Sequence, residues 1–469
     1  MSVQCLPNEI LGLVFSWVPC LDVRRTLPLV SRQWQSVASD AYATGRRPCV
    51  GPKSRRYTLC HQAAAAGHVD CLGYARLRGR SWGANVCAAA AAGGHLTCLE
   101  YAHTNGCPWD ECTPKAAAAG GHLDCLEYAH RNGCPSDSRT CDEAAKRGHV
   151  ACLAYAASIG CVCGRDTWVT AAAGGSTECL DIIENYSHWT INEADNGDLC
   201  AAAAGGGHIA AIEWIMSRGA WDAFSLLEGA ARHGRIDCLL YLLDRGLGAD
   251  SCYGDSDVDV VAAAARGGHM DCLRALIENG FSVGISVSTA AARGGHIDCL
   301  RYLRDTHAGV DWFSSNKTCE AAASKGHLAC LQYAHTNGYP WGRRTVSAAA
   351  YSGHLDCLVY AIQHGCPYDD YAIEAAARSG KLQCVRYLYS IGAPVHGRAL
   401  RAAAKAGKPG TVRFLLDNGC PIDTTTCADA AHPDVFLLLH GAGCKLSRNW
   451  SWGTPLFYSG WQRSVYNAI

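Results

Sequence analysis

A histidine followed three residues later by a cysteine has the spacing of a zinc-ligand pair, and this chain repeats it many times. In AAAAGHVDCLGYA (63–75), His68 precedes Cys71 by three residues. On a helix the two side chains would lie on one face, about one turn apart. A structural zinc ion takes four ligands, so two such pairs would have to converge. Eleven segments carry the cysteine, at Cys71, Cys98, Cys125, Cys152, Cys179, Cys238, Cys272, Cys299, Cys330, Cys357 and Cys384.

The pattern around these pairs favours packing over metal binding. The cysteine lies in an apolar stripe, and other copies carry Ala211, Thr411 or Val435 in its place, which indicates a small buried slot. The histidine gives way to Ser, Arg or Lys in some copies and follows a glycine, where it can hydrogen-bond between repeats. Packed helices lie about 10 Å apart, so equivalent pairs would not converge. We expect no metal and no other cofactor, with zinc binding as the less favoured alternative.

Other segments with chemical potential are equally weak. GDSDVD (254–259) alternates aspartates like a calcium loop, but Val260 stands where the loop needs glycine and Arg266 where it needs glutamate, so we expect a solvated acidic loop. CVC (161–163) lacks the spacing of a redox motif. The sequence contains no phosphate-binding loop, dinucleotide fingerprint or nucleophile elbow. We therefore expect no catalytic residues and no enzyme activity.

The pairs belong to a repeat that fills the chain from about residue 58. AAAAGGHLDCLEYAHRNGCPSD (116–137), for example, recurs as AAASKGHLACLQYAHTNGYPWG (321–342). Most copies lie 27 residues apart. Taking the histidine as a marker, the fourteen copies are at His68, His95, His122, His149, Ser176, His208, Arg235, His269, His296, His327, His354, Lys381, Lys408 and His432.

Each copy predicts two short helices joined by a turn. An alanine-rich helix ends in glycine, and a second helix carries apolar residues at helical spacing, such as Leu123, Leu126 and Tyr128. A following glycine, such as Gly133, suits a left-handed cap. Neither helix is long enough to be stable alone, so copies must stack and share a core. The sequence predicts an all-α protein whose residues 58–445 form an α-solenoid of about fourteen helix-turn-helix repeats.

This pattern resembles the ankyrin family, with Ala-Ala, Gly-His and the closing glycine at matching offsets over residues 58–445. The unit is about 27 residues against the usual 33, and the entry motif is reduced to a lone threonine, as in TPKAAAAG (113–120). The missing residues belong to the projecting hairpin of ankyrin proteins, which puts that binding surface in question. The abbreviated style is similar to ankyrin-like arrays of giant DNA viruses of amoebae.

Residues 1–45 differ in composition and predict a separate three-helix unit. LPNEIL (6–11) and LDVRRTLPLVSRQW (21–34) resemble the opening and closing parts of an F-box. That family binds the Skp-type adaptor of a cullin-RING ubiquitin ligase, while its C-terminal repeats select a substrate. The alternative is a simple N-terminal cap on the solenoid. The resemblance implies an adaptor-facing set of Leu6, Pro7, Ile10, Leu11, Val14 and Phe15, completed by Leu29, Val30 and Trp34.

Three junctions exceed the usual repeat length, and insertions of this kind often line a binding face. Their aromatic residues are candidates for target contact, because aromatics are enriched at interface hot spots; the alternative is that they cover their own loops. Turn aromatics that recur at one repeat position, such as Trp109 and Trp341, are expected to pack between repeats. The aromatic tail, 446–469, is expected to cap the last repeat or, less favourably, to bind a partner. The target-binding candidates are Trp189, Tyr253, Trp312 and Phe313.

Composition limits the remaining possibilities. The chain has 469 residues, with 41 basic and 42 acidic, so its net charge of −1 is unlike that of a nucleic-acid-binding polycation. It has no apolar stretch long enough for a membrane helix, and its start lacks the basic leader of a signal peptide. The 29 cysteines are spread evenly, which favours a reducing compartment, cytoplasmic or nuclear, in the host cell if the protein is viral.

Together these features predict a substrate-recognition adaptor of an SCF-type ubiquitin ligase. Its partners would be a Skp-type adaptor and an unidentified target protein, with no nucleic acid and no membrane. The alternative is a non-catalytic ankyrin-repeat interaction scaffold with no ligase role.

Overall fold

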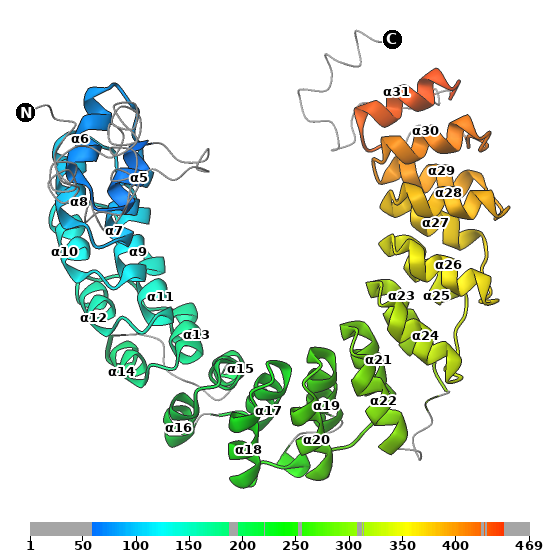
Figure 1. Cartoon of the computed structure of the whole chain (residues 1–469), viewed down its shortest axis with the longest axis horizontal. Helices are drawn as coiled ribbons and strands as arrows, with labels where there is room; N and C mark the ends of the chain where they lie inside the picture. The colour runs from blue at the N-terminus through cyan, green and yellow to red at the C-terminus, as the bar shows by residue number, and fades with distance from the viewer. Residues whose placement is uncertain are drawn as a thin grey trace, which may run out of the picture. The chain divides into compact units, whose positions relative to one another are not determined.

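The computed structural model describes residues 59–186, 196–219, 221–251, 256–306, 312, 314–423, 426 and 429–444. The chain divides into two compact units, unit 1 at Met1–Gly229 and unit 2 at Ala230–Ile469. Over the described residues, both units consist of paired short helices and contain no β-strand (Figure 1). A single 3₁₀ turn, η3 (Ala249–Ser251), precedes one of the long junctions.

The first helix of each repeat is rich in alanine, which has the highest helix propensity and the smallest side chain that favours a helix. The described residues contain thirteen of these first helices. They are α5 (Leu59–Ala65), α7 (Ala84–Ala92), α9 (Cys112–Gly120), α11 (Ser138–Lys146), α13 (Arg165–Gly174), α15 (Gly197–Gly206), α17 (Ala223–Arg232), α19 (Ser256–Gly267), α21 (Ile285–Gly294), α23 (Lys317–Lys325), α25 (Arg343–Ser352), α27 (Asp370–Ser379) and α29 (Gly397–Lys405).

The second helix of each repeat begins directly after the marker position, and one follows each of the fourteen predicted markers. This agreement confirms the repeat assignment. They are α6 (Val69–Leu77), α8 (Leu96–Thr104), α10 (Leu123–Arg131), α12 (Val150–Ser158), α14 (Thr177–Tyr186), α16 (Ile209–Ser217), α18 (Ile236–Asp244), α20 (Met270–Glu278), α22 (Ile297–Thr306), α24 (Leu328–Thr336), α26 (Leu355–Gln363), α28 (Leu382–Ser390), α30 (Pro409–Asp417) and α31 (Pro433–Gly441).

Glycine ends both helices of a repeat in a left-handed conformation. Gly121 has a φ of 76° and donates its N–H to the Ala118 carbonyl, while His122 donates to the Ala117 carbonyl at 3.0 Å. These bonds satisfy carbonyls that the helix end would leave unpaired. After the second helix, Gly133 repeats the arrangement with a φ of 77°. The chain therefore reverses direction twice in each repeat.

Packing within each unit is by layers. First helices contact first helices of neighbouring repeats, and second helices contact second helices, as α9 contacts α7 and α11 while α10 contacts α8 and α12. Ala117 and Ala118 are fully buried between first helices, and Leu126 is fully buried beneath the second. Burial of one leucine contributes about 1.5–3 kcal/mol, so neighbouring repeats supply the core that a single repeat lacks.

The structure confirms the predicted all-α solenoid of short helix-turn-helix repeats. The predicted N-terminal three-helix unit (1–45) and the aromatic tail (446–469) lie outside the described residues. No helix in the described part of the chain is long and apolar enough to span a membrane.

Candidate protein-interaction surface

The marker histidine of one repeat packs against a glycine of the repeat before it. A Cβ atom at Gly94 would come within 2.4 Å of His122 Nδ1, and one at Gly121 within 2.7 Å of His149 Nδ1. His149 Nε2 also donates to the Ala119 carbonyl oxygen at 3.2 Å. The same bond recurs from His208 to Ala173 and from His269 to Arg232, both at 3.1 Å. These contacts confirm that the histidine joins repeats.

The marker cysteines fill the predicted buried slot. Cys98 and Cys125 are fully buried, as is Ala211 at the equivalent position. Burial raises the pKa of the Cys98 thiol to about 11, so the thiol stays protonated at neutral pH. Among the residues that the structure describes, no three His, Cys, Asp or Glu side chains are grouped as a metal site. The geometry therefore agrees with packing.

A second series of cysteines, in the turn after the second helix, was not recognised in the sequence. Cys107 Sγ donates to the Gly83 carbonyl at 3.4 Å, and Cys134 Sγ donates to the Asp110 carbonyl at 3.3 Å. Cys366 makes the equivalent bond to the turn of the preceding repeat. Each bond joins residues 24 apart, so the turns of neighbouring repeats are tied to one another.

The turn aromatics pack between repeats, as the sequence predicts. Trp109 stacks on His103 with ring centroids 3.8 Å apart, and His103 Nδ1 lies 2.9 Å from the hydroxyl of Tyr128 in the next repeat. In unit 2, Trp341 stacks on His335 at the same 3.8 Å. The close repetition of this geometry indicates a structural cluster rather than an individual binding site.

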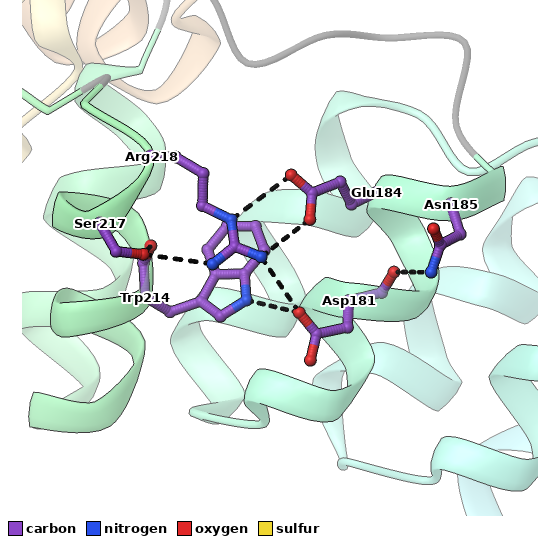
Figure 2. A network of polar contacts seen from close by, with 6 residues as sticks. All are labelled: Asp181, Glu184, Asn185, Trp214, Ser217 and Arg218. Carbon is purple, nitrogen blue, oxygen red and sulfur yellow. Dashed lines mark hydrogen bonds and ion pairs between the residues drawn. The ribbon is translucent and has the colours of Figure 1, made fainter.

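A polar network holds α14 and α16 together at the first long junction (Figure 2). The Arg218 guanidinium contacts Glu184 Oε2 at 2.9 Å and Asp181 Oδ1 at 3.3 Å, and lies 3.7 Å from the centre of the Trp214 ring. The Trp214 indole N–H donates to the same Asp181 oxygen at 2.8 Å. The sequence analysis did not identify this network, although Trp214 and Arg218 have the i, i+4 spacing of neighbours on one helix face.

Unit 2 carries two hollows on the exposed side of its first helices. The α21 hollow has a volume of about 360 Å³ and is lined by α19, α21 and the start of α23, with Arg266, Arg293 and Lys317 among its residues. The α29 hollow has a volume of about 660 Å³ and is lined by α27, α29 and Asp429. Side chains of the first helices therefore form the walls of both hollows.

The acidic segment 254–259 corrects one expectation. Ser256 begins α19, and Asp257 is 8% exposed rather than solvated. Its Oδ2 accepts a hydrogen bond from the Ser282 backbone N–H at 3.0 Å. Burial opposes the charge, but the hydrogen bonds from Ser282 outweigh burial and lower the pKa of Asp257. Asp257 therefore ties a helix start to the turn of the following repeat.

Most predicted site residues lie outside the described residues. These comprise the whole adaptor-facing set, and Trp189, Tyr253 and Phe313 among the target-binding candidates. Trp312 is described and is 3% exposed. Its burial favours the alternative that this ring packs within the array rather than contacting a target.

Two family models match the chain. Residues 346–426 match the model for ankyrin repeats in three copies, and residues 3–50 match the model described as F-box-like. No curated protein matches the chain. Among solved structures, the chain is similar to the human ASB11 ankyrin repeat domain at 22% sequence identity, over 36% of this chain and 84% of that chain, with a TM-score of 0.31.

The matches support an F-box plus ankyrin-repeat protein with a substrate-adaptor or interaction role. Both families are typically interaction modules without catalytic activity. The relevant question for this chain is therefore which of its surfaces binds a partner.

Proposed function

We propose that this protein is a substrate-recognition subunit of an SCF-type ubiquitin ligase. Its F-box-like segment binds the Skp-type adaptor through the residues named above, and its repeats bind a target protein. The observation that carries the proposal is the order of the two family matches, with the F-box-like segment at 3–50 ahead of the repeats.

The repeat structure suits the second half of this role. Its histidines, marker cysteines and turn aromatics are used between repeats, which leaves the exposed faces of the helices to meet a partner. The short-repeat style, similar to arrays of giant DNA viruses of amoebae, makes a host protein the first class of target to search.

Binding of the purified full-length chain to a Skp-type adaptor tests the proposal. Wild-type protein should bind, and I10D/L11D should weaken binding at least tenfold, because two charges would enter an apolar interface. L77D is the matched control, since Leu77 lies on α6, is 87% exposed and has no part in the F-box-like segment.

Absence of binding by the wild-type chain would overturn the ligase role. The alternative would then be a scaffold that holds or blocks its target, with an N-terminal cap in place of an F-box. Equal weakening by L77D would show that the loss in I10D/L11D is not specific to the F-box-like segment.

A further inference from the structure

The exposed positions of the first helices in unit 2 carry a repeated basic pattern. Three residues before the marker, α19 and α21 place Arg266 and Arg293, and α27 and α29 place Arg378 and Lys405. All four side chains are exposed. The same position in unit 1 holds alanine or glycine in five of its six repeats, Lys146 being the exception. The basic pattern therefore belongs to unit 2 and is not a requirement of the repeat.

A second position strengthens this pattern. Ten residues before the marker, α23, α25 and α29 begin with Lys317, Arg344 and Arg398, all exposed. Asp259 of α19 is the one acidic residue at these two positions between α19 and α29. Since neighbouring first helices contact one another from α19 to α29, the two positions form one continuous face. We refer to it as the basic face.

Most of this charge is not neutralised within the chain. Arg378 pairs with Glu374 at 2.6 Å. By contrast, Arg266, Arg293 and Lys317 form no ion pair with any residue in the described part of the chain. Exposed cations without partners attract an acidic ligand and raise its association rate.

The shape of the basic face agrees with its charge. Arg266, Arg293 and Lys317 line the α21 hollow, while Arg398 and Lys405 line the α29 hollow. A side chain of a bound partner can thus enter at either end of the face and meet two or more cations.

Two tyrosines lie between the hollows and supply an apolar component. Tyr351 of α25 and Tyr371 of α27 occupy the same two repeat positions as the cations. They are 52% and 49% exposed, which is unusual for large aromatic side chains in this solenoid. Exposed tyrosines beside charged residues are typical anchors of protein interfaces.

We propose that the basic face of unit 2 binds an acidic, extended segment of a partner protein. This inference rests on the target-binding role proposed above for the repeats. Six first helices spaced about 8–10 Å apart span about 40–50 Å, which an extended chain covers in about fifteen residues. A protein ligand fits better than a nucleic acid, because Asp259, Glu320 and Glu374 interrupt the face and would repel phosphates.

Fluorescence anisotropy with the full-length chain tests the inference. The probe is a labelled 20-residue peptide with glutamate at every second position, measured from 50 to 300 mM NaCl. Wild-type protein should bind it, and affinity should fall as salt screens the exposed charges. R266E/R293E and R398E/K405E should each weaken binding about tenfold. Y351A/Y371A should weaken binding by a factor that persists at high salt.

R386E/R413E is the matched control. Arg386 and Arg413 are exposed on α28 and α30, so this variant has the same net charge as the test variants but leaves the basic face intact. It should bind the probe within a factor of two of wild type. Equal loss in the control, no loss in the test variants, or tighter binding of a 20-nucleotide single-stranded RNA or DNA would overturn the inference.

The same variants separate this inference from the ligase proposal. R266E/R293E and R398E/K405E should still bind the Skp-type adaptor, whereas I10D/L11D should still bind the acidic peptide. Loss of adaptor binding in the wild-type chain would remove the ligase role and leave the peptide result unaffected.

Discussion

A glycine on one repeat and the marker residue of the next form each junction, and the structure explains which replacements this pairing accepts. At Lys381 and Lys408 the aliphatic part of the side chain lies where the ring would be, close to Gly353 and Gly380. Long apolar carbon chains can therefore fill the space. Ser176 is too short to do so, and no atom of it comes closer than 3.6 Å to a Cβ placed at Gly148. Packing, and not ligand chemistry, decides what is tolerated.

Substitution of Gly94 by alanine should be more destabilising than substitution of Gly106. Both residues have positive φ, 69° and 77°, so both variants incur about 1–2 kcal/mol of backbone strain. Only at Gly94 does the new Cβ meet a histidine ring, which adds about 1–3 kcal/mol. Urea unfolding would measure the difference. G94A/H122A should recover part of the loss, and equal stability of G94A and G106A would contradict the packing role of His122.

Helix pairs are held by more than apolar burial where the repeat spacing changes. The network around Arg218 lies at the longest connection within unit 1, between second helices α14 and α16. One guanidinium satisfies two carboxylates and covers an indole ring, which fixes the approach of the two helices.

Loss of this network should weaken the α14–α16 pair. R218A should lower the free energy of unfolding of unit 1 by about 1–2 kcal/mol, since it removes a cation–π contact and leaves Asp181 and Glu184 facing each other. R218K should show an intermediate loss because an ammonium cannot make the same planar contacts. R131A is the control, as Arg131 pairs only with Glu127 on its own helix and is 70% exposed. Hydrogen exchange in α14 should change in R218A alone.

Over the whole molecule, the recurring thiol slot makes stability sensitive to alkaline pH. Burial raises the pKa of Cys299, Cys330 and Cys357 from 9.0 to about 11 each. Below pH 9 the thiols are protonated in both states, and their contribution is fully present. Above pH 9 the unfolded chain loses these protons first, so stability falls until the folded thiols ionise near pH 11.

The urea midpoint of the wild-type chain should therefore fall steeply between pH 9 and 11. C299A/C330A/C357A should be less stable at pH 7.5, because cavities form, but its midpoint should fall less over the same pH range. Alanine is a suitable replacement since Ala211 occupies this slot in another repeat. An unchanged pH dependence in the variant would exclude the thiols as its cause.

Periodicity predicted the helices well because each repeat is an independent copy of the same pattern. Fourteen occurrences of one motif also made packing a better explanation of His68 and Cys71 than metal binding. Single occurrences were harder to interpret: Asp257 was placed in a solvated loop because its hydrogen bond to Ser282 reaches a different repeat. Trp312 was expected at a surface for the same reason, since only tertiary structure reveals its burial.

The basic face was missed for a different reason. Sequence comparison of the copies followed the positions that stay constant, which are the buried ones, whereas Arg266, Arg293 and Lys405 occupy a position that varies. Sorting the exposed positions by charge along the array would have revealed the pattern. The adaptor-facing residues, from Leu6 to Trp34, remain predictions from the motif.

The shared junction has an evolutionary consequence. Each junction takes its glycine from one copy and its marker residue from the next, so any duplicated block of 27 residues brings both halves. A tandem duplication in the gene creates one further complete junction without a compensating mutation. The array can thus lengthen by copying while its exposed positions diverge, which allows new partners to be acquired faster than a new scaffold could arise.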